Sequence, residues 1–289
     1  MLKNKALALA AAIGVLSGSS SLVVAQDSIK LGLSMPTQNS PYYQTMVRAF
    51  EATCKEKGYT CSTTDAQADI AKQVSDIEDL LQKGINALIL NPRDGSAVVP
   101  AIKAAKEAGV PTFVIDSGVD ASAPIVSIVQ SDNQANGEAV GNWLAGQLGC
   151  EPVRIALISG NKGNVVGKIR RLSAISGIVE ASLAACGSAD VAVLAHGYTE
   201  WDAAGGLDVM EDILVAHQGK FNVVLSEADI MNIGALKALE AAGVADEVTI
   251  IASADGQKQA YELIMEGRYG ATGLNSPGLV TETAMDLAV

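Results

Sequence analysis

Short apolar runs alternate with longer amphipathic stretches along almost the whole chain after residue 26. The runs are three to seven residues long and rich in β-branched residues, which is typical of strands buried on both faces of a sheet. They lie at residues 29–35, 87–90, 112–115, 125–129, 155–158, 191–194, 223–225, 249–251 and 271–274. The stretches between them repeat apolar residues at helical spacing. We predict helices at residues 42–57, 70–83, 98–108, 135–148, 169–185, 204–216 and 231–242.

The alternation of strands and helices predicts the fold class. Such a pattern gives parallel sheets with helices on both faces. The strands are too many for one ordinary doubly wound sheet, and the series begins again near Arg154. A polar break at residues 130–133 follows a strand and is the best candidate for a passage between two lobes. We therefore expect an α/β protein with two doubly wound parallel-sheet lobes.

The first 25 residues have the pattern of a secretory signal peptide. Lys3 and Lys5 precede an apolar run at residues 6–16, and small residues lead to a cleavage site after Ala25. The alternatives are a membrane anchor and a buried helix, but the run is shorter than the roughly 20 residues that span a bilayer. We expect export across the inner membrane into the periplasm. At the other end, residues 280–289 read as a helix with no following strand, so we expect the sequence to be incomplete there.

The acidic balance of the chain bears on its partners. The formal net charge is −12, and removal of the predicted signal peptide takes away two lysines and no acids. Nucleic acids bind to basic surfaces, so this charge argues against a nucleic-acid partner. A hydrophobic content of 49% is sufficient for two well-filled cores.

Four cysteines are present, and export makes disulfides permissible. Cys54 should lie late in a helix and Cys61 in the next strand, while Cys150 should precede a strand and Cys186 should end the helix after it. Each pair belongs to adjacent elements, so we favour disulfides Cys54–Cys61 and Cys150–Cys186. The alternative is that all four are buried free thiols. No zinc-type spacing is present.

Polar and aromatic side chains follow the predicted strands, where open parallel sheets bind their ligands. Asp116 and Asn91 each follow a strand directly, and Tyr42 and Tyr43 open a helix after Pro41. Carboxylates and amides bind hydroxyl groups, and flat rings cover the apolar faces of hydroxylated molecules. This mixture favours a small polar ligand with several hydroxyl groups.

Several of these residues also have a purely structural interpretation. Asp94 can cap a helix as readily as it can bind a ligand, and Asn91 can simply shape a turn. Asp132 and Asp229 are expected to be helix N-caps. Trp201, taken alone, is more often a core residue than a site residue.

The glycine-rich segment 160–167 follows a strand and opens a helix, as phosphate-binding loops do. Its spacing is neither GxxxxGK[ST] nor GxGxxG, and the next strand ends at His196 instead of an acid that could bind a ribose. Nucleotide binding is therefore disfavoured. Arg170 and Arg171 lie early in the helix that follows, and one of them should face the cleft, where a guanidinium can grip two neighbouring oxygens.

Catalytic motifs are poorly represented. His196 and His217 are the only histidines and do not lie in a metal-ligand pattern, and there is no GxSxG elbow. We expect no enzymatic activity, no cofactor and no bound metal.

In combination, short motifs along the chain resemble the periplasmic ribose-binding type of ABC-transporter substrate-binding protein, which is related to the effector domains of lac-repressor-like regulators. The resemblance covers nearly everything after Gln26. Each motif is weak alone, but their order is specific. They are residues 36–43, 91–94, 115–117, 131–133, 201–202 before 205–207, 227–229, 254–256, and Asn275.

The family resemblance implies a periplasmic binding protein type 1 fold with two similar lobes joined by three crossings. On this basis residues 26–131 with 276–289 form the N-terminal lobe, and residues 132–275 form the C-terminal lobe. The usual last strands, which return the chain to the second lobe, are missing here.

The resemblance also implies ligand-binding residues from both lobes. The aromatic residues among them should stack on the ligand, and the polar ones should bind its hydroxyl groups or lie near the hinge. For the arginine of the second lobe, the match favours Arg171 over Arg170. The implied residues are Tyr42, Tyr43, Asn91, Asp116, Arg171, Trp201, Asp255 and Asn275.

Four positions depart from the family pattern. Ser40 and Ala228 replace asparagines, Ser117 replaces an arginine, and Ala254 replaces a ring. These changes reshape the pocket, so a different monosaccharide or a polyol is expected in place of ribose.

The resemblance implies an exported solute-binding protein that captures a hydroxylated ligand by hinge closure and delivers it to the permease of an ABC importer. A ligand sensor that presents its ligand to a chemoreceptor would have the same sequence features. A regulator effector domain is disfavoured by the signal segment and by the absence of an N-terminal helix-turn-helix. A periplasmic enzyme on a doubly wound fold is the least favoured alternative. We expect a monomer.

Overall fold

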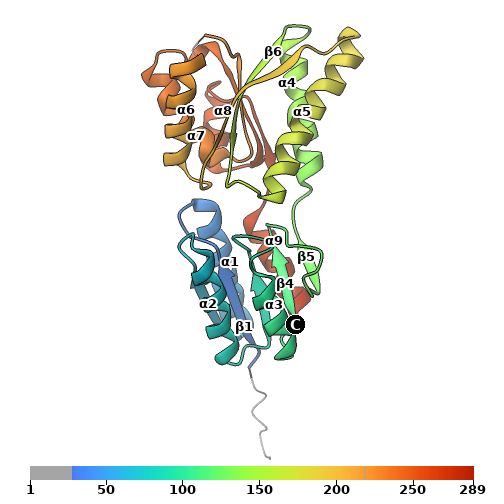
Figure 1. The fold of residues 1–289 in the computed structure, drawn as a ribbon, viewed down its shortest axis with the longest axis vertical. Helices are drawn as coiled ribbons and strands as arrows, with labels where there is room; N and C mark the ends of the chain where they lie inside the picture. The colour runs from blue at the N-terminus through green and yellow to red at the C-terminus, as the bar shows by residue number, and fades with distance from the viewer. Residues whose placement is uncertain (1–27, 218) are drawn as a thin grey trace, which may run out of the picture.

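The computed structural model describes residues 28–217 and 219–289, and these form two α/β lobes stacked end to end (Figure 1). The predicted signal peptide lies outside the described residues. The two-lobed parallel fold expected from the sequence is confirmed. Within the described part of the chain, no helix combines the length and apolar character needed to cross a membrane.

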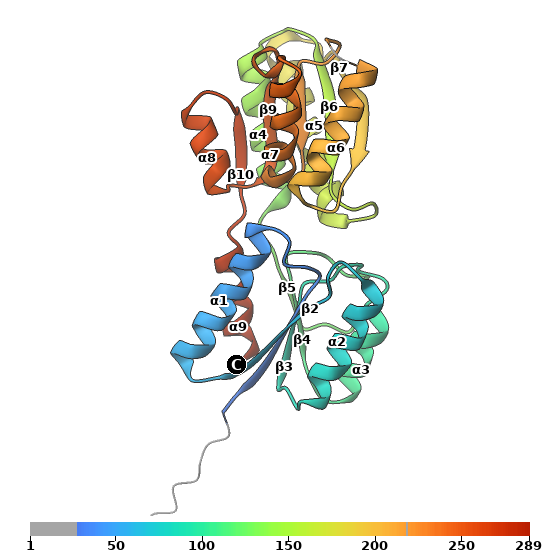
Figure 2. The same cartoon turned by 90° about the vertical axis from the view of Figure 1, so that its left-hand side faces the viewer.

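The N-lobe is built on a five-stranded parallel sheet in the order β2-β1-β3-β4-β5. Its strands are β1 (Lys30–Met35), β2 (Thr60–Asp65), β3 (Ala87–Leu90), β4 (Thr112–Ile115) and β5 (Ser127–Val129). Its helices are α1 (Pro41–Lys57), α2 (Ile70–Gln82), α3 (Val99–Glu107) and α9 (Pro277–Ala288). Helices α1 and α9 cover one face of the sheet, and α2 and α3 cover the other (Figure 2).

The C-lobe contains a second five-stranded parallel sheet in the order β10-β9-β8-β6-β7. Its strands are β6 (Val153–Ser159), β7 (Val191–Tyr198), β8 (Val223–Ser226), β9 (Thr249–Asp255) and β10 (Ala271–Leu274). Its helices are α4 (Asn133–Leu148), α5 (Val165–Cys186), α6 (Ala203–His217), α7 (Asp229–Ala241), the 3₁₀ helix η1 (Ala245–Glu247) and α8 (Lys258–Met265). Helices α4 and α5 pack on one face, and α6 and α7 pack on the other.

Two chain segments connect the lobes. The chain passes to the C-lobe between Val129 and Asn133 and returns between Leu274 and Pro277, so α9 brings the C-terminus back to the N-lobe (Figure 1). The third connection that the family resemblance implies is not found within residues 28–217 and 219–289. The two segments are tied together, because the Ser131 hydroxyl donates to Asn275 Oδ1 over 2.6 Å.

Both disulfides expected from the sequence are confirmed. Cys54 near the end of α1 joins Cys61 in β2, and Cys150 before β6 joins Cys186 at the end of α5. Each disulfide therefore fixes a helix to a strand, or to the start of a strand, beside it.

Candidate ligand-binding site

A cavity lies between the lobes, where the carboxyl ends of strands from both sheets face each other. Parallel sheets present loops and helix N-termini at this edge, so polar side chains from distant parts of the sequence meet there. The cavity is lined by Ser40, Tyr42, Tyr43, Asp116, Ser117, Asn164, Val166, Arg170, Trp201, Ala228, Ile230 and Asp255.

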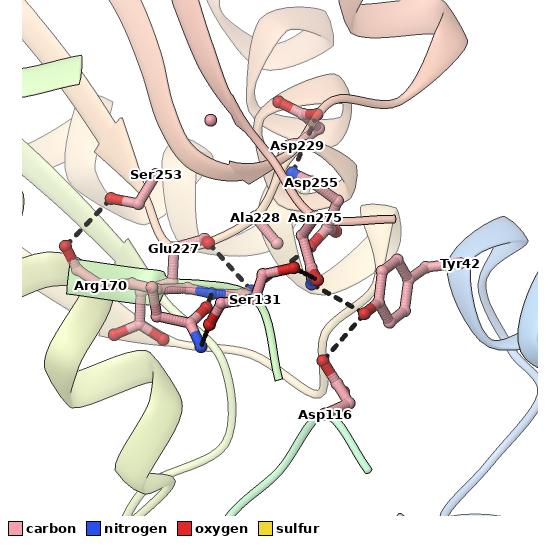
Figure 3. Close-up of polar contacts among 12 residues, drawn as sticks. Tyr42, Asp116, Ser131, Arg170, Glu227, Ala228, Asp229, Ser253, Asp255 and Asn275 are labelled. Carbon is pink, nitrogen blue, oxygen red and sulfur yellow. Dashed lines mark hydrogen bonds and ion pairs between the residues drawn. The ribbon is translucent and has the colours of Figure 1, made fainter. Parts of the chain in front are cut away.

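The aromatic wall of the N-lobe comes from the first turn of α1. Ser40 caps this helix and Pro41 occupies its first turn, so the chain turns sharply after β1 and points Tyr42 and Tyr43 at the strand ends. The two rings meet edge to face, with centroids 5.8 Å apart. Burial, and then the charge of Asp116, raise the pKa of Tyr42 well above its ordinary value. The Tyr42 hydroxyl therefore stays protonated, and it donates a hydrogen bond to Asp116 Oδ1 over 2.9 Å (Figure 3).

Asp116 lies directly after β4 with a left-handed backbone, φ 61°. This conformation is uncommon for a residue with a side chain and is found mainly where function or a turn requires it. Its carboxylate accepts from Tyr42 and, at Oδ2, from Asn91 Nδ2 over 3.2 Å. Asn91 is fully buried and does not line the cavity. Its link to the cavity is the hydrogen bond to Asp116, which does line it.

Arg170 projects from α5 into the centre of the site (Figure 3). Its Nε donates to Asn133 Oδ1 over 2.8 Å, and its Nη1 lies 3.3 Å from both Asp255 Oδ1 and the Glu227 carbonyl. Burial lowers the pKa of this guanidinium, but the nearby Asp255 and Asp116 carboxylates outweigh it and leave the pKa raised. Arg170 is therefore a cation in the cavity lining, and its Nε and Nη1 atoms are held in place by protein acceptors.

Arg171, which the motif match favoured, lies outside the cavity lining. Its Nη1 pairs with Glu227 Oε1 at 2.7 Å instead. The helical phase explains the difference. Arg170 shares the buried face of α5 with Val166 and Ala174, whereas Arg171 is one residue, or about 100°, around the helix. The apolar and small residues of that face are visible in the sequence and could have selected Arg170.

Trp201 forms the aromatic wall of the C-lobe. It follows β7, is almost fully buried and has a left-handed backbone, φ 60°. Its ring covers Gly160, where a Cβ atom would lie 1.9 Å from the ring, and its indole N–H donates to Asn161. The Arg170 guanidinium lies 6.0 Å from the ring centroid, within reach of a cation–π interaction.

Asp255 ends β9 and is held by a buried neighbour. Asp229 Oδ2 accepts from the backbone N–H groups of Asp255, over 3.1 Å, and Gln257, over 2.9 Å. The expectation that Asp229 is an N-cap is wrong: it is the first residue of α7, and its side chain braces the β9–α8 loop. Asp132 does cap its helix, since its carboxylate accepts from the Ala135 N–H. Burial raises the pKa of Asp255 to about 7, even though Arg170 opposes this shift.

Asn275 lies in the segment that returns the chain to the N-lobe, and its side chain bonds to a residue of each lobe. Its Nδ2 donates to the Tyr42 hydroxyl over 2.7 Å and to Asp255 Oδ1 over 3.2 Å (Figure 3). A continuous chain of hydrogen bonds thus runs from Asp116 through Tyr42 and Asn275 to Asp255. Sequence reasoning identified every member of this chain.

The structure brings most of the expected residues together. Five of the eight line the cavity, and Asn91 and Asn275 are bonded to lining residues; only Arg171 is turned away. Sequence reasoning placed Ser40, Ser117 and Ala228 at pocket positions without making them ligand contacts, and it ranked Arg170 below Arg171; the lining residues that it missed altogether are Asn164, Val166 and Ile230. Among residues 28–217 and 219–289, no group of three or more His, Cys, Asp or Glu side chains is arranged to hold a metal ion.

Comparison with known proteins gives consistent matches. The family model described as "Periplasmic binding protein domain" matches residues 31–289. The ribose import binding protein of Bacillus subtilis (strain 168) is 31% identical over 258 residues, which are 89% of this chain and 80% of that protein.

Two solved structures share the arrangement of the lobes. One is an ABC transporter solute-binding protein from Mycobacterium smegmatis with bound glycerol, which has a TM-score of 0.80 and 31% identity and covers 90% of this chain and 88% of the other. The other is the Caulobacter myo-inositol binding protein bound to myo-inositol, with a TM-score of 0.82 and 26% identity. The match covers 92% of this chain and 88% of the other.

Proposed function

Since the chain belongs to the periplasmic binding protein family, we propose that it is an exported solute-binding protein that captures a monosaccharide or a polyol between its two lobes. The observation that carries the proposal is the composition of the interlobe cavity. Carboxylates, a guanidinium and hydroxyl groups surround a space walled by three aromatic rings. Polar groups of this kind bind hydroxyl groups and the rings cover C–H faces, which is how proteins hold small hydroxylated ligands.

The proposed mechanism is hinge closure. Tyr42 and Asp116 belong to the N-lobe, whereas Arg170, Trp201 and Asp255 belong to the C-lobe, so a ligand can contact all five only when the lobes are together. A ligand that bridges both lobes shifts an open population toward the closed form. Asn275 lies in one of the hinge segments and bonds to both sides, so it can transmit ligand contacts to the hinge.

The ligand class, the destination of the ligand and the absence of catalysis belong to the same proposal. The relatives are named for ribose import, for bound glycerol and for bound myo-inositol, and these three compounds are all hydroxylated molecules. We propose delivery to the permease of an ABC importer, or presentation to a chemoreceptor, by a periplasmic monomer that carries out no reaction. The serine at position 117 and the alanine at 228 line the cavity, and they favour a ligand other than ribose.

A thermal-shift screen tests the proposal. Sugars, polyols, amino acids and nucleotides are added at high concentration to the exported form of the chain. A ligand at about 100 times its dissociation constant stabilises the folded protein by about 2.7 kcal/mol, and for a chain of this size each kcal/mol raises Tm by about 2–4 °C. We expect stabilisation by hydroxylated compounds. Stabilisation only by nucleotides, or only by amino acids without hydroxyl groups, contradicts the proposal.

A further inference from the structure

The charged groups that line the interlobe cavity do not balance. Asp116 from the N-lobe and Asp255 from the C-lobe are both there, and Arg170 is the one cation among the lining residues (Figure 3). Two further arginines near the lobe interface are each paired with a carboxylate. Arg171 is bonded to Glu227, and Arg93 is bonded to Glu200 across the mouth of the cleft. The lining therefore carries one carboxylate more than its single guanidinium can neutralise.

Position 117 is a place where a cation could correct the imbalance. Ser117 follows Asp116 directly, lines the cavity and is 8% exposed, so an arginine at this position would lie in the cavity wall and balance the second carboxylate. The serine hydroxyl cannot do so. The surplus negative charge is therefore a property of this chain's own sequence.

A surplus charge in a buried site is costly unless something neutralises it. Asp255 is only 7% exposed and Arg170 only 4%, so water cannot fully compensate. The groups near Asp255 come from both lobes. They are Arg170 of α5, Asp229 of α7, Asp116 after β4, Tyr42 and Tyr43 of α1, Tyr269 before β10 and Asn275 after β10. With one cation and two other carboxylates among them, burial raises the pKa of Asp255 to about 7.

The walls of the cavity also favour positive charge. Tyr42, Tyr43 and Trp201 present aromatic rings to the same space as the two carboxylates. Ring faces attract cations, most strongly where water is excluded. A cavity lined by carboxylates and aromatic rings is suited to a protonated amine. The other polar groups of the lining stay available to bind hydroxyl groups.

We propose that the ligand is a hydroxylated molecule bearing a cationic nitrogen, an amino-substituted sugar or polyol, whose ammonium group is held by Asp116 and Asp255. This inference rests on the proposed function, because it names the ligand class of the same site. The two carboxylates belong to opposite lobes. Closure therefore brings both onto one cation, and the ammonium group neutralises the surplus charge that closure buries.

Matched pairs of compounds test the inference. Glucosamine, galactosamine, mannosamine and glucamine are each compared with glucose, galactose, mannose and sorbitol by isothermal titration at pH 7. We expect at least one amine to bind about tenfold or more tightly than its neutral counterpart, as buried charge pairs do. If in every pair the neutral compound binds as tightly as its amine, or more tightly, the inference is overturned and the proposed function stays intact. If no compound of either kind binds, the inference is overturned, and the thermal-shift screen decides on the proposed function separately.

The surplus charge can be neutralised by a cationic ligand or by protonation of Asp255. The pH dependence of binding distinguishes these two possibilities. A cationic ligand requires Asp255 to be ionised, so the affinity for glucamine should rise from pH 5 to pH 7.5 and then level off, because an aliphatic amine stays protonated throughout this range. A neutral ligand would instead bind with a protonated Asp255, and its affinity would fall as the pH rises through about 7. A falling profile for the best ligand overturns the inference.

A variant at position 117 provides the matched control. Ser117→Arg adds the missing cation and should lower the preference for the amine over its neutral counterpart by about tenfold or more. Ser117→Asn adds bulk and polarity without charge and should leave that preference unchanged. The ratio of the two dissociation constants is the readout, so a general loss of affinity does not affect the result. An unchanged ratio in Ser117→Arg, with the ligand-free variant shown to be folded by its melting curve, refutes the inference.

Discussion

At the scale of single residues, the site depends on a few side chains whose polar atoms are already engaged with one another. Asp116 accepts from Tyr42 and Asn91, and Arg170 bonds to Asn133 and Asp255. Such contacts hold the side chains in place before a ligand arrives and reduce the ordering cost of binding. The residues that bind and the residues that position them are therefore distinguishable by mutation.

Asp116→Ala should abolish ligand binding without unfolding the protein. The substitution removes a carboxylate that lines the cavity and leaves the Tyr42 hydroxyl and Asn91 amide without their shared acceptor. Loss of a buried, hydrogen-bonded charge costs binding about 2–5 kcal/mol. Titration of the best ligand from the screen measures the loss, and the far-ultraviolet circular dichroism spectrum checks the fold. An affinity equal to that of the unmodified protein would contradict the assignment of this cavity as the ligand site.

The neighbouring arginines offer a matched comparison. Arg170→Met should reduce affinity for a neutral hydroxylated ligand by about 30-fold or more, because it removes the guanidinium N–H donors that would bind the ligand's hydroxyl groups. Arg171→Met should change affinity little and instead lower the free energy of unfolding by about 1–3 kcal/mol, since it leaves the buried Glu227 carboxylate without its ion-pair partner. Titration and chemical denaturation of both variants check this. The reverse pattern would show that the motif match, and not the helical phase, had identified the binding arginine.

At the scale of elements, close packing of α4 on α5 sets the position of Arg170. A Cβ atom at Gly137 would lie 2.0 Å from the Ser173 hydroxyl, and one at Gly141 would lie 2.2 Å from the Ala174 carbonyl. Only glycine lets the two helices approach this closely. The approach brings Asn133, at the start of α4, within hydrogen-bond distance of Arg170.

The disulfides should contribute unequally to stability. Cys150 and Cys186 are 36 residues apart in sequence, whereas Cys54 and Cys61 are separated by 7. In the chain-entropy account a longer closed loop restricts the unfolded chain more, and typical disulfides stabilise by about 2–4 kcal/mol. Replacement of Cys150 and Cys186 by serine should therefore lower the free energy of unfolding more than the same change at Cys54 and Cys61. Denaturation of the two double variants tests the order, and an equal or reversed effect contradicts it.

At the scale of the whole molecule, the lobes meet outside the cavity as well as within it. Arg93, after β3 of the N-lobe, is paired with Glu200, after β7 of the C-lobe. This ion pair can form only when the lobes are close together, so it should favour the closed arrangement. Its partly exposed position limits its strength to about 1 kcal/mol or less.

Glu200→Gln should therefore weaken ligand binding by a few-fold at most, and the effect should shrink in high salt because exposed charges are screened. The intrinsic stability of each lobe should not change, since the side chain belongs to a surface loop. Titrations at low and high salt measure the effect, and Glu211→Gln, which removes an exposed carboxylate of α6, serves as a control for the same change in overall charge. An equal loss in both variants would show that overall charge, and not this pair, favours closure.

The sequence by itself determined most of the repeating strands and helices, though not β2 and α8, together with the division into two lobes, the disulfide pairs and most of the polar residues at the strand ends. These features depend on local spacing: buried strands are short and apolar, helices repeat their apolar positions, and the residue after a parallel strand lies at the ligand-binding edge. Asp116, Asp255 and Asn275 could be identified for this reason, although they are far apart in the chain.

Only the tertiary structure decided that Asp229 braces a loop instead of capping a helix, and that Asp116 and Asp255 line one cavity with a single cation. Each of these depends on the direction of a side chain or on the charge of groups brought together by different elements. The rotation of about 100° per residue along α5 separates Arg170, which lines the cavity, from Arg171, which pairs with Glu227. The balance of buried charge exists only after both lobes have been placed around the same space.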